Sequence, residues 1–294
     1  MLALLPAAGL AACAAPLPPV APGDAAAAQA LLARSADAHG LAALDGLGDI
    51  SVSYAGRWRP FVGRLQPDLV DAGFSGHSEE RLLLRDRLTA QAHTGPDGRK
   101  QVRRRRAPEG GGRGSVQVWF NGTEARTPQD RVRRDAAALV ADGYTLFLLG
   151  PMLLARQPLA AAGLQAVETI ESGGQDHRCD VVRVRLAPGL GFSDGDDLAL
   201  YLDRAAGLMR RVRFTLNGLD ATQGAVAEVD LWGHVARHGI QWPTRFHERL
   251  LRPVPLGVHD WSLTGLDVRR GLDAAEVAGP AFTGKAAAHA AALA

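Results

Sequence analysis

The sequence predicts a mainly β domain of the α+β class, made of antiparallel strands with one long helical passage between two groups of them. Three observations predict this class. Apolar and polar residues alternate with a period of two in many short runs, such as Ile50, Val52 and Tyr54. Turn residues separate the runs, as in the Gly-Pro-Asp-Gly sequence at 95–98. The runs follow one another without a helix after each strand, so a meander is expected and not βαβ units.

The elements are expected in the following order. Helical spacing predicts a first helix over 26–38, with Asp24 as N-cap and Gly40 as stop. An apolar helix is expected from 130 to 149; Gly150-Pro151 breaks it, and another turn follows over 152–155. It is too apolar for a surface helix and, with its proline, too short for a membrane span, so it should pack on the sheet. Strands are expected over 50–55, 80–87, 88–94, 99–106 and 115–120, and then over 164–171, 178–186, 198–203, 209–216, 225–235, 240–249 and 258–269.

Length and composition set the class of protein. The chain has 294 residues, of which 47% are apolar and 22% charged. A chain of this size can bury a core without disulfides or metals. The formal net charge is only +2. A general electrostatic attraction to nucleic acid is therefore not expected.

The first residues have the pattern of an export signal. Residues 1–12 are small and apolar and too few to span a bilayer, although a basic start is missing. They end in Leu-Ala-Ala before Cys13, which resembles the lipobox of bacterial lipoproteins. The resemblance implies cleavage before Cys13, a lipid on its sulfur, and an extended tether over 13–25. Because residue 14 is not Asp, analogy favours the outer membrane, with the domain facing the periplasm.

The order of elements and two hairpin motifs resemble the LolA/LolB-like superfamily of periplasmic lipoprotein carriers. One motif is Tyr201-Leu202-Asp203 followed by Gly207-Leu208-Met209; the other is Gly239-Ile240 followed by Pro243. The resemblance implies a curved, unclosed half-barrel over 26–272, with helices plugging its concave face. Residues 273–294 are expected to form a flexible, alanine-rich tail.

If the resemblance extends to function, the concave face holds a lipid or a lipidated protein in an apolar cavity. An alternative is that the same residues simply fill the core. The candidate cavity residues are Trp58, Phe74, Trp119, Leu146, Phe147, Leu149, Met152, Trp232 and Phe246.

No motif points to catalysis, a cofactor or a metal. The nine histidines lack a Cys or carboxylate at ligand spacing, and His234 and His238 fall near a turn. The acidic run at 194–197 lacks the glutamate and flanking helices of an EF-hand. Cys179 is expected to be a small buried residue in a strand, with a reactive thiol as the alternative. We therefore expect a non-enzymatic protein without a cofactor.

Four arginines, 103–106, lie on one expected strand, which puts two on each face. They are interpreted as a charged edge strand that prevents aggregation, or as a site for an anionic partner. The second interpretation supports a rival function, an envelope interaction or sensor module that holds no lipid. The leading hypothesis is an outer-membrane-anchored lipoprotein that binds or transfers a lipid or a lipidated protein.

Overall fold

The structure, a computed structural model, describes residues 17, 20, 24–108 and 112–282. Its α-helices are α1 (Ala25–His39), α2 (Leu41–Asp45), α3 (Pro60–Leu65), α4 (Pro67–Val70) and α5 (Arg131–Leu154), and its short 3-10 helices are η1 (Ala72–Phe74), η2 (Pro128–Asp130), η3 (Asp220–Thr222) and η4 (Gly279–Ala281). Its strands are β1 (Asp49–Trp58), β2 (His77–Leu83), β3 (Leu88–Gly95), β4 (Gly98–Arg105), β5 (Ser115–Phe120), β6 (Thr123–Glu124), β7 (Ala161–Ser172), β8 (Gln175–Leu186), β9 (Asp196–Asp203), β10 (Met209–Thr215), β11 (Val226–Trp232), β12 (Val235–Arg237), β13 (Ile240–Trp242), β14 (Arg245–Arg252) and β15 (Leu256–Val268).

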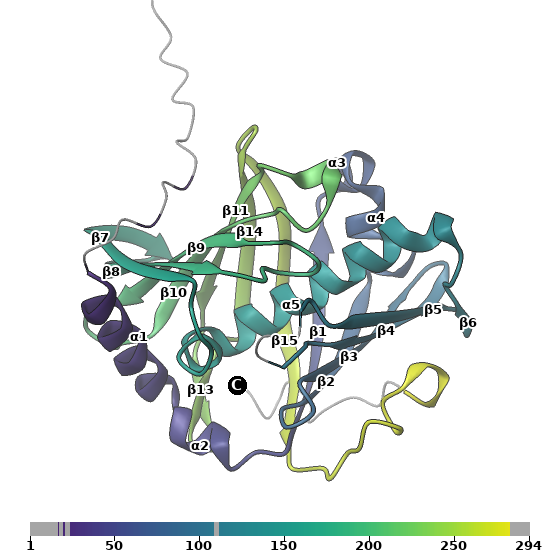
Figure 1. The fold of residues 1–294 in the computed structure, drawn as a ribbon, viewed down its shortest axis with the longest axis horizontal. Helices are drawn as coiled ribbons and strands as arrows, with labels where there is room; N and C mark the ends of the chain where they lie inside the picture. The colour runs from purple at the N-terminus through teal and green to yellow at the C-terminus, as the bar shows by residue number, and fades with distance from the viewer. Residues whose placement is uncertain (1–16, 18–19, 21–23, 109–111, 283–294) are drawn as a thin grey trace, which may run out of the picture.

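Thirteen strands form one sheet in the order β6-β5-β4-β3-β2-β1-β15-β14-β11-β10-β9-β8-β7. Neighbouring strands run antiparallel, and β15 joins the two groups by pairing with β1 and with β14. The end strands β6 and β7 do not pair with each other, so the sheet curves around α5 without closing (Figure 1). The prediction of an unclosed antiparallel half-barrel with a helix in its concave face is therefore confirmed.

Two segments differ from the sequence prediction. Residues 60–74, for which no element was expected, form α3, α4 and η1. Pro60 and Pro67 each lie in the first turn of a helix, where a missing N–H costs nothing. In addition, residues 235–242 lie outside the large sheet and pair with each other as the separate hairpin β12–β13. The turn of this hairpin is tight because His238 and Gly239 both adopt positive φ. Both hairpins that carry the resemblance are present at the expected places.

The main core lies between the concave face and α5. Alternate residues of the strands point to this side, and they meet Leu146, Leu149 and Met152 of the helix. The segment Pro128–Leu154 is long and apolar enough to cross a membrane, but 89% of its most apolar stretch is buried inside the protein. It is thus the core helix of this domain.

Gly150 bends α5 at the predicted break. Its φ of +37° and ψ of −116° lie outside the helical region. A Cβ at this position would also lie 2.6 Å from Cε of Met209, so only glycine fits the bend. Pro151 follows directly and resumes the helix for one further turn.

A buried ion pair fixes α5 to the sheet. Arg104 of β4 and Asp142 of α5 are both 2% exposed, and the guanidinium donates to the carboxylate at 2.9 Å. The same carboxylate accepts the Gly191 N–H at 2.9 Å, and Arg104 donates to the Gly191 carbonyl at 2.8 Å. The interpretation of 103–106 as an edge strand is therefore wrong. Strand β4 is paired on both sides by β3 and β5, and one of its arginines faces inward as a structural group.

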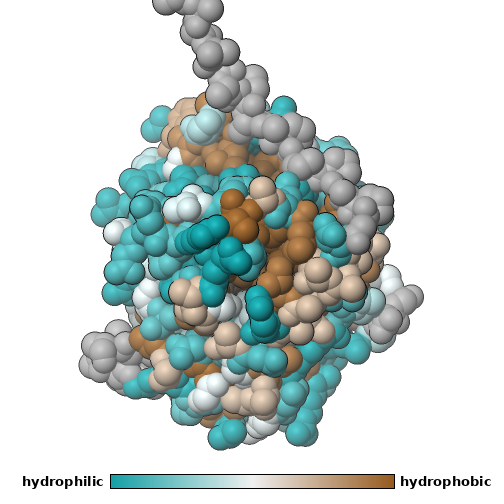
Figure 2. All heavy atoms as spheres, turned by 90° about the vertical axis from the view of Figure 1, so that its left-hand side faces the viewer, coloured by the Kyte–Doolittle hydropathy of each residue, from teal (hydrophilic) through white to brown (hydrophobic). Residues whose placement is uncertain are grey.

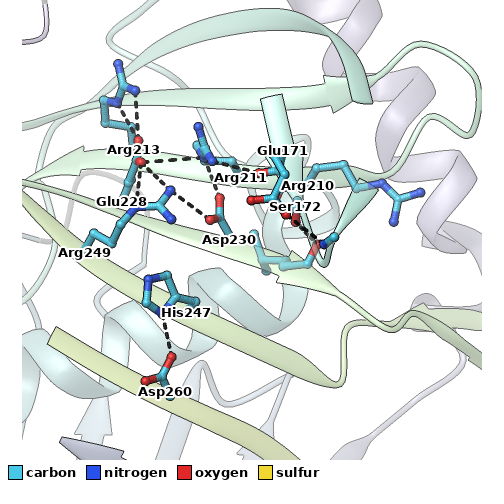
Figure 3. Close-up of polar contacts among 12 residues, drawn as sticks. Glu171, Ser172, Arg210, Arg211, Arg213, Glu228, Asp230, His247, Arg249 and Asp260 are labelled. Atoms are coloured by element: carbon cyan, nitrogen blue, oxygen red, sulfur yellow. Dashed lines mark hydrogen bonds and ion pairs between the residues drawn. The ribbon is translucent and has the colours of Figure 1, made fainter. Parts of the chain in front are cut away.

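The convex face of β10, β11 and β14 carries a network of charges (Figure 3). Glu228 accepts from Arg213 at 2.9 Å and from Arg249 at 2.6 Å, and Asp230 pairs with Arg211 at 2.5 Å. Burial by itself raises the pKa of Glu228, but the surrounding arginines hold that pKa below its usual value. Cross-strand pairs of opposite charge thus keep this side of the sheet polar and paired.

The chain also covers parts of the convex face with its own ends. Val277 and Phe282 are buried against β2 and β3, and Phe282 lies beneath the guanidinium of Arg81, 5.1 Å from ring centre to Cζ. At the other end of the sheet, Leu17 of the predicted tether is buried beside Tyr201. Figure 2 shows the side of the molecule with α1 and the edge strand β7, where apolar side chains lie among hydrophilic ones. The predicted signal at 1–12, Cys13 and the tail beyond 282 lie outside the described residues.

The buried pair generates a prediction about stability. Arg104→Met or Asp142→Leu should each lower the free energy of unfolding by about 3–5 kcal/mol, because each leaves one buried charge without its partner. The double variant should be clearly more stable than the sum of the two losses predicts. Urea denaturation of the four proteins measures this coupling. Single losses below about 1 kcal/mol would show that water reaches the pair and that it does not fix α5.

Candidate functional site

A small cavity lies between the concave face, α4 and the first half of α5. Its volume is about 30 Å³, room for one or two water molecules. It is lined by Tyr54, Gly56, Trp58, Leu69, Val70, Ser75, Gly76, His77, Ser78, His93, Lys100, Val140, Tyr144, His259 and Trp261. We call it the concave pocket; aromatic rings and titratable groups both contribute to its wall.

Stacked rings form one wall of the concave pocket. Trp58 stacks on His259 with centroids 4.1 Å apart, and His259 stacks on Trp261 at 4.6 Å. Trp261 continues the stack to Phe246 at 4.9 Å. Residues 259 and 261 share a face of β15 because side chains alternate along a strand. The pairing of β15 with β1 and β14 then brings Trp58 and Phe246 to either side of them.

A buried carboxyl group lies next to the concave pocket. Glu80 of β2 is 0% exposed, and its Oε1 accepts from Gln91 Nε2 at 2.7 Å. Its Oε2 is buried and has no hydrogen-bond partner among the described residues. Burial raises the pKa of Glu80 to about 8, so the group is largely protonated at neutral pH. A protonated carboxyl can donate a hydrogen bond to a ligand that enters this space.

Lys100 and His93 contribute the nitrogen groups of the concave pocket. The Lys100 Nζ lies 2.9 Å from Asp71 Oδ2, at the turn between α4 and η1. Burial lowers the pKa of Lys100, although Asp71 opposes the shift. Burial also lowers the pKa of His93 well below its usual value, and the charge of Lys100 adds to the effect. Lysine is therefore the main positive charge that an anionic group would meet here.

The structure brings together only some of the predicted cavity residues. Trp58 and Phe246 belong to the ring stack, and the ring centroids of Phe147 and Trp261 are 5.9 Å apart. The other α5 candidates, Leu146, Leu149 and Met152, are packed in the main core. That these residues contact a ligand stays a prediction.

Three of the predicted cavity residues lie elsewhere. Phe74 packs on Phe120 near the β5 end of the sheet, with centroids 5.2 Å apart. Trp119 and Trp232 face the convex side: Trp119 meets Gly279, and Trp232 meets Gly173 of the β7–β8 turn. Trp119 and Trp232 therefore cannot line a cavity on the concave face. Aromatic character marks a buried position, but only the register of each strand decides which face it occupies.

Sequence reasoning missed His93, Lys100, His259 and Trp261, which line the concave pocket, and Glu80, which lies beside it. Each lies at a position where period two predicts an inward side chain, as with His93 beyond Gln91. An ionisable residue at an inward strand position was the available signal.

Two histidines of the described residues, His247 and His259, lie on the neighbouring strands β14 and β15. Their cross-strand partners are Asp260 and Glu248, so the two rings point to opposite faces. Within the described residues, no three His, Cys, Asp or Glu side chains are arranged to hold a metal ion. Cys179 is fully buried in β8, which confirms the prediction, and burial raises the pKa of its thiol to about 12.

The buried carboxyl generates a pH prediction. The pKa of Glu80 is about 8 in the folded chain against a usual value of 4.5, so between these values the folded chain keeps a proton that the unfolded chain releases. This contribution to the free energy of unfolding falls as pH rises through that window. Glu80→Gln removes it. Between about pH 5 and about pH 8, the free energy of unfolding of the variant should therefore rise relative to that of the wild type, by at most roughly 1.4 kcal/mol per pH unit.

Urea denaturation across that pH range measures the difference. Glu168→Gln, at an exposed position of β7 away from Glu80, is the control and should follow the wild-type profile. If Glu80→Gln also ran parallel to the wild type, the carboxyl would be ionised in the folded protein and the pocket would be hydrated.

Comparison with known proteins gives similarities of fold. No protein-family model and no curated sequence matches the chain. A DUF1329 family protein from Desulfovibrio piger is similar in structure, with a TM-score of 0.47 and 13% identity over 86% of this chain and 96% of that one. A LolA superfamily protein from Nitrosomonas europaea has a TM-score of 0.41 and 13% identity, over 85% of this chain and 96% of that one. A structure described as a putative outer membrane lipoprotein-sorting protein domain from Vibrio parahaemolyticus has a TM-score of 0.38 and 9% identity, over 84% of this chain and 94% of that one. These are similarities in structure, at 13% identity or less to this chain.

Proposed function

We propose that this chain is a non-catalytic lipoprotein of the cell envelope that takes up the acyl chains of a lipid or lipidated protein between its concave face and α5. The observation that supports the proposal most is how α5 is attached. In the described part of the chain, no backbone hydrogen bond joins α5 to a strand. The helix can therefore move away from the sheet without breaking a strand ladder.

Directed contacts between α5 and the sheet are made by side chains. Among the described residues they include the Arg104–Asp142 pair, the Thr89–Thr145 hydroxyl contact at 3.1 Å and the Tyr144–His259 contact at 3.5 Å. The Arg133 guanidinium also lies over the Phe120 ring, 3.5 Å from its centroid. The remaining contact is apolar packing, which has no directional requirement. Acyl chains that replace the helix would bury the same apolar surface, at roughly 0.8 kcal/mol per methylene. Acyl chains could thus offset part of the apolar area that the helix uncovers, while the Arg104–Asp142 pair would have to open.

The concave pocket supplies a place for the polar end of the ligand. Lys100 offers a positive charge and Glu80 a protonated carboxyl, both beside the apolar core. An amphiphile with an anionic or hydrogen-bonding headgroup fits this arrangement, with its chains directed along α5. In this proposal, the pocket of about 30 Å³ is the point from which the cavity opens.

A covalent lock tests the proposal. The two Oγ1 atoms of Thr89 and Thr145 lie 3.1 Å apart, so cysteines at these positions are placed to form a disulfide between β3 and α5. In a full chain that carries Cys13→Ser, the oxidised double variant should lose uptake of a phospholipid with a fluorescent acyl chain. Reduction should restore uptake. Cys179 is buried with a raised thiol pKa, so it does not compete.

The single variants Thr89→Cys and Thr145→Cys control for loss of the hydroxyls and should take up lipid in both redox states. Native mass spectrometry of protein purified without detergent gives an independent readout of bound lipid. Equal uptake by the locked and reduced proteins would exclude a cavity beneath α5. A protein that takes up no lipid in any form would favour the interaction-module alternative.

Anchoring through Cys13 to the outer membrane is part of the proposal and rests on the sequence around that residue. The wild-type protein should fractionate with the outer membrane, and Cys13→Ser should appear in the soluble periplasmic fraction, because the acyl chains supply the stable attachment. Membrane fractionation with mass analysis of the N-terminal peptide measures both. An unmodified Cys13 in exported wild-type protein would contradict the anchor.

A further inference from the structure

Exposed apolar side chains gather at one end of the molecule. Five large hydrophobic residues are exposed in the described part of the chain, and three of them lie in two neighbouring segments. Phe61 and Leu65 of α3 are 54% and 53% exposed, and Val254 of the β14–β15 turn is 64% exposed. The other two, Val132 and Val167, lie in α5 and β7 and are 43% and 41% exposed. We call α3 together with the β14–β15 turn the apolar tip; both segments lie at the top of Figure 1.

The apolar tip is held in place by a small core of its own. Val62 of α3, Val70 and Val258 are buried together, with Leu250 and Leu256 packed against them. The Arg59 N–H also donates to the Val258 carbonyl at 2.9 Å, which ties the start of α3 to β15. Because Val62 faces inward, Phe61 and Leu65, which are four residues apart, share the outward face. Their exposure is therefore a built feature and not the fraying of a chain end.

The two segments that form the apolar tip, with their flanking residues, carry charge of one sign. Residues 57–65 and 250–257 contain four arginines and no Asp or Glu. Arg57 and Arg64 are exposed, and Arg252 is half-buried; among the described residues none of these three forms an ion pair. The fourth, Arg59, pairs with Asp260 at 2.7 Å. Apolar protrusions between unpaired arginines suit a surface that is anionic outside and apolar just beneath.

A bilayer with anionic lipids is such a surface. Arginine guanidinium groups bind the phosphates, and their stems allow the apolar residues to enter the interface. Phe61, Leu65 and Val254 lie on two short segments that also carry exposed arginines, whereas a protein partner is generally met by one larger, contiguous and closely packed patch. We propose that the apolar tip docks the domain on the anionic headgroups of a membrane, with these three side chains in the interface. This docking goes beyond the proposed function, because it requires no lipid to be taken up.

Local fluorescence tests the proposal. In the full chain carrying Cys13→Ser, Val254→Cys or Phe61→Cys is labelled with nitrobenzoxadiazole, whose emission shifts to the blue in an apolar environment. We expect a blue shift on adding phosphatidylcholine vesicles that contain phosphatidylglycerol. The labels at Val132→Cys and Val167→Cys are the matched controls and should not shift. No shift at 254, or an equal shift at 167, overturns the proposal.

The charge requirement is tested separately. Arg64→Glu should lower the apparent vesicle affinity roughly tenfold or more, and salt should lower the affinity of the parent protein. Equal binding of both proteins, or equal binding to pure phosphatidylcholine vesicles, overturns the role of the headgroups. A shift at 254 that grows with protein concentration and needs no vesicles would assign the tip to contact between copies of this chain. Because lipid uptake is not measured here, failure of this test leaves the locked-helix test unaffected.

Discussion

The structure depends on one constraint: a large antiparallel sheet that curves but does not close must cover its apolar concave face. A closed barrel would fill its interior with side chains from the strands themselves. Here the two end strands, β6 and β7, do not meet, and α5 supplies the missing layer. The helix is consequently apolar around most of its surface and resembles a membrane span in composition. The position of every other element follows from this packing.

Covering the face with a helix places polar groups in an apolar layer. The Arg104–Asp142 pair and the Thr89–Thr145 contact hold α5 in one register, and both are desolvated. A buried ion pair adds little net stability compared with apolar packing, but it sets one orientation and disfavours the others. Glu80 has no such partner for its second oxygen, and it remains largely protonated. Few directed bonds and much undirected packing therefore hold α5 on the sheet.

The concave pocket and the small core beneath the apolar tip share residues. Trp58 and Val70 line the pocket, and both also belong to the small core that supports α3. The wall of the concave pocket is therefore in direct contact with the core that supports the tip. On the convex side, the arginines and acids of the charge network are paired across adjacent strands.

The sequence by itself determined the class of fold, most strand positions, the broken apolar helix and the burial of Cys179. These depend on local periodicity and on residues such as Gly150 and Pro151, whose conformational limits are intrinsic. It did not determine the faces of Trp119 and Trp232, the inward turn of Arg104 from a run of four arginines, or the helices of 60–74. Those depend on strand register and on partners far along the chain, as Arg104 depends on Asp142 and Gly191. The concave pocket was decided in the same way, since its rings and charges meet only when β1, β2, β3, β4, β15 and α5 pack together.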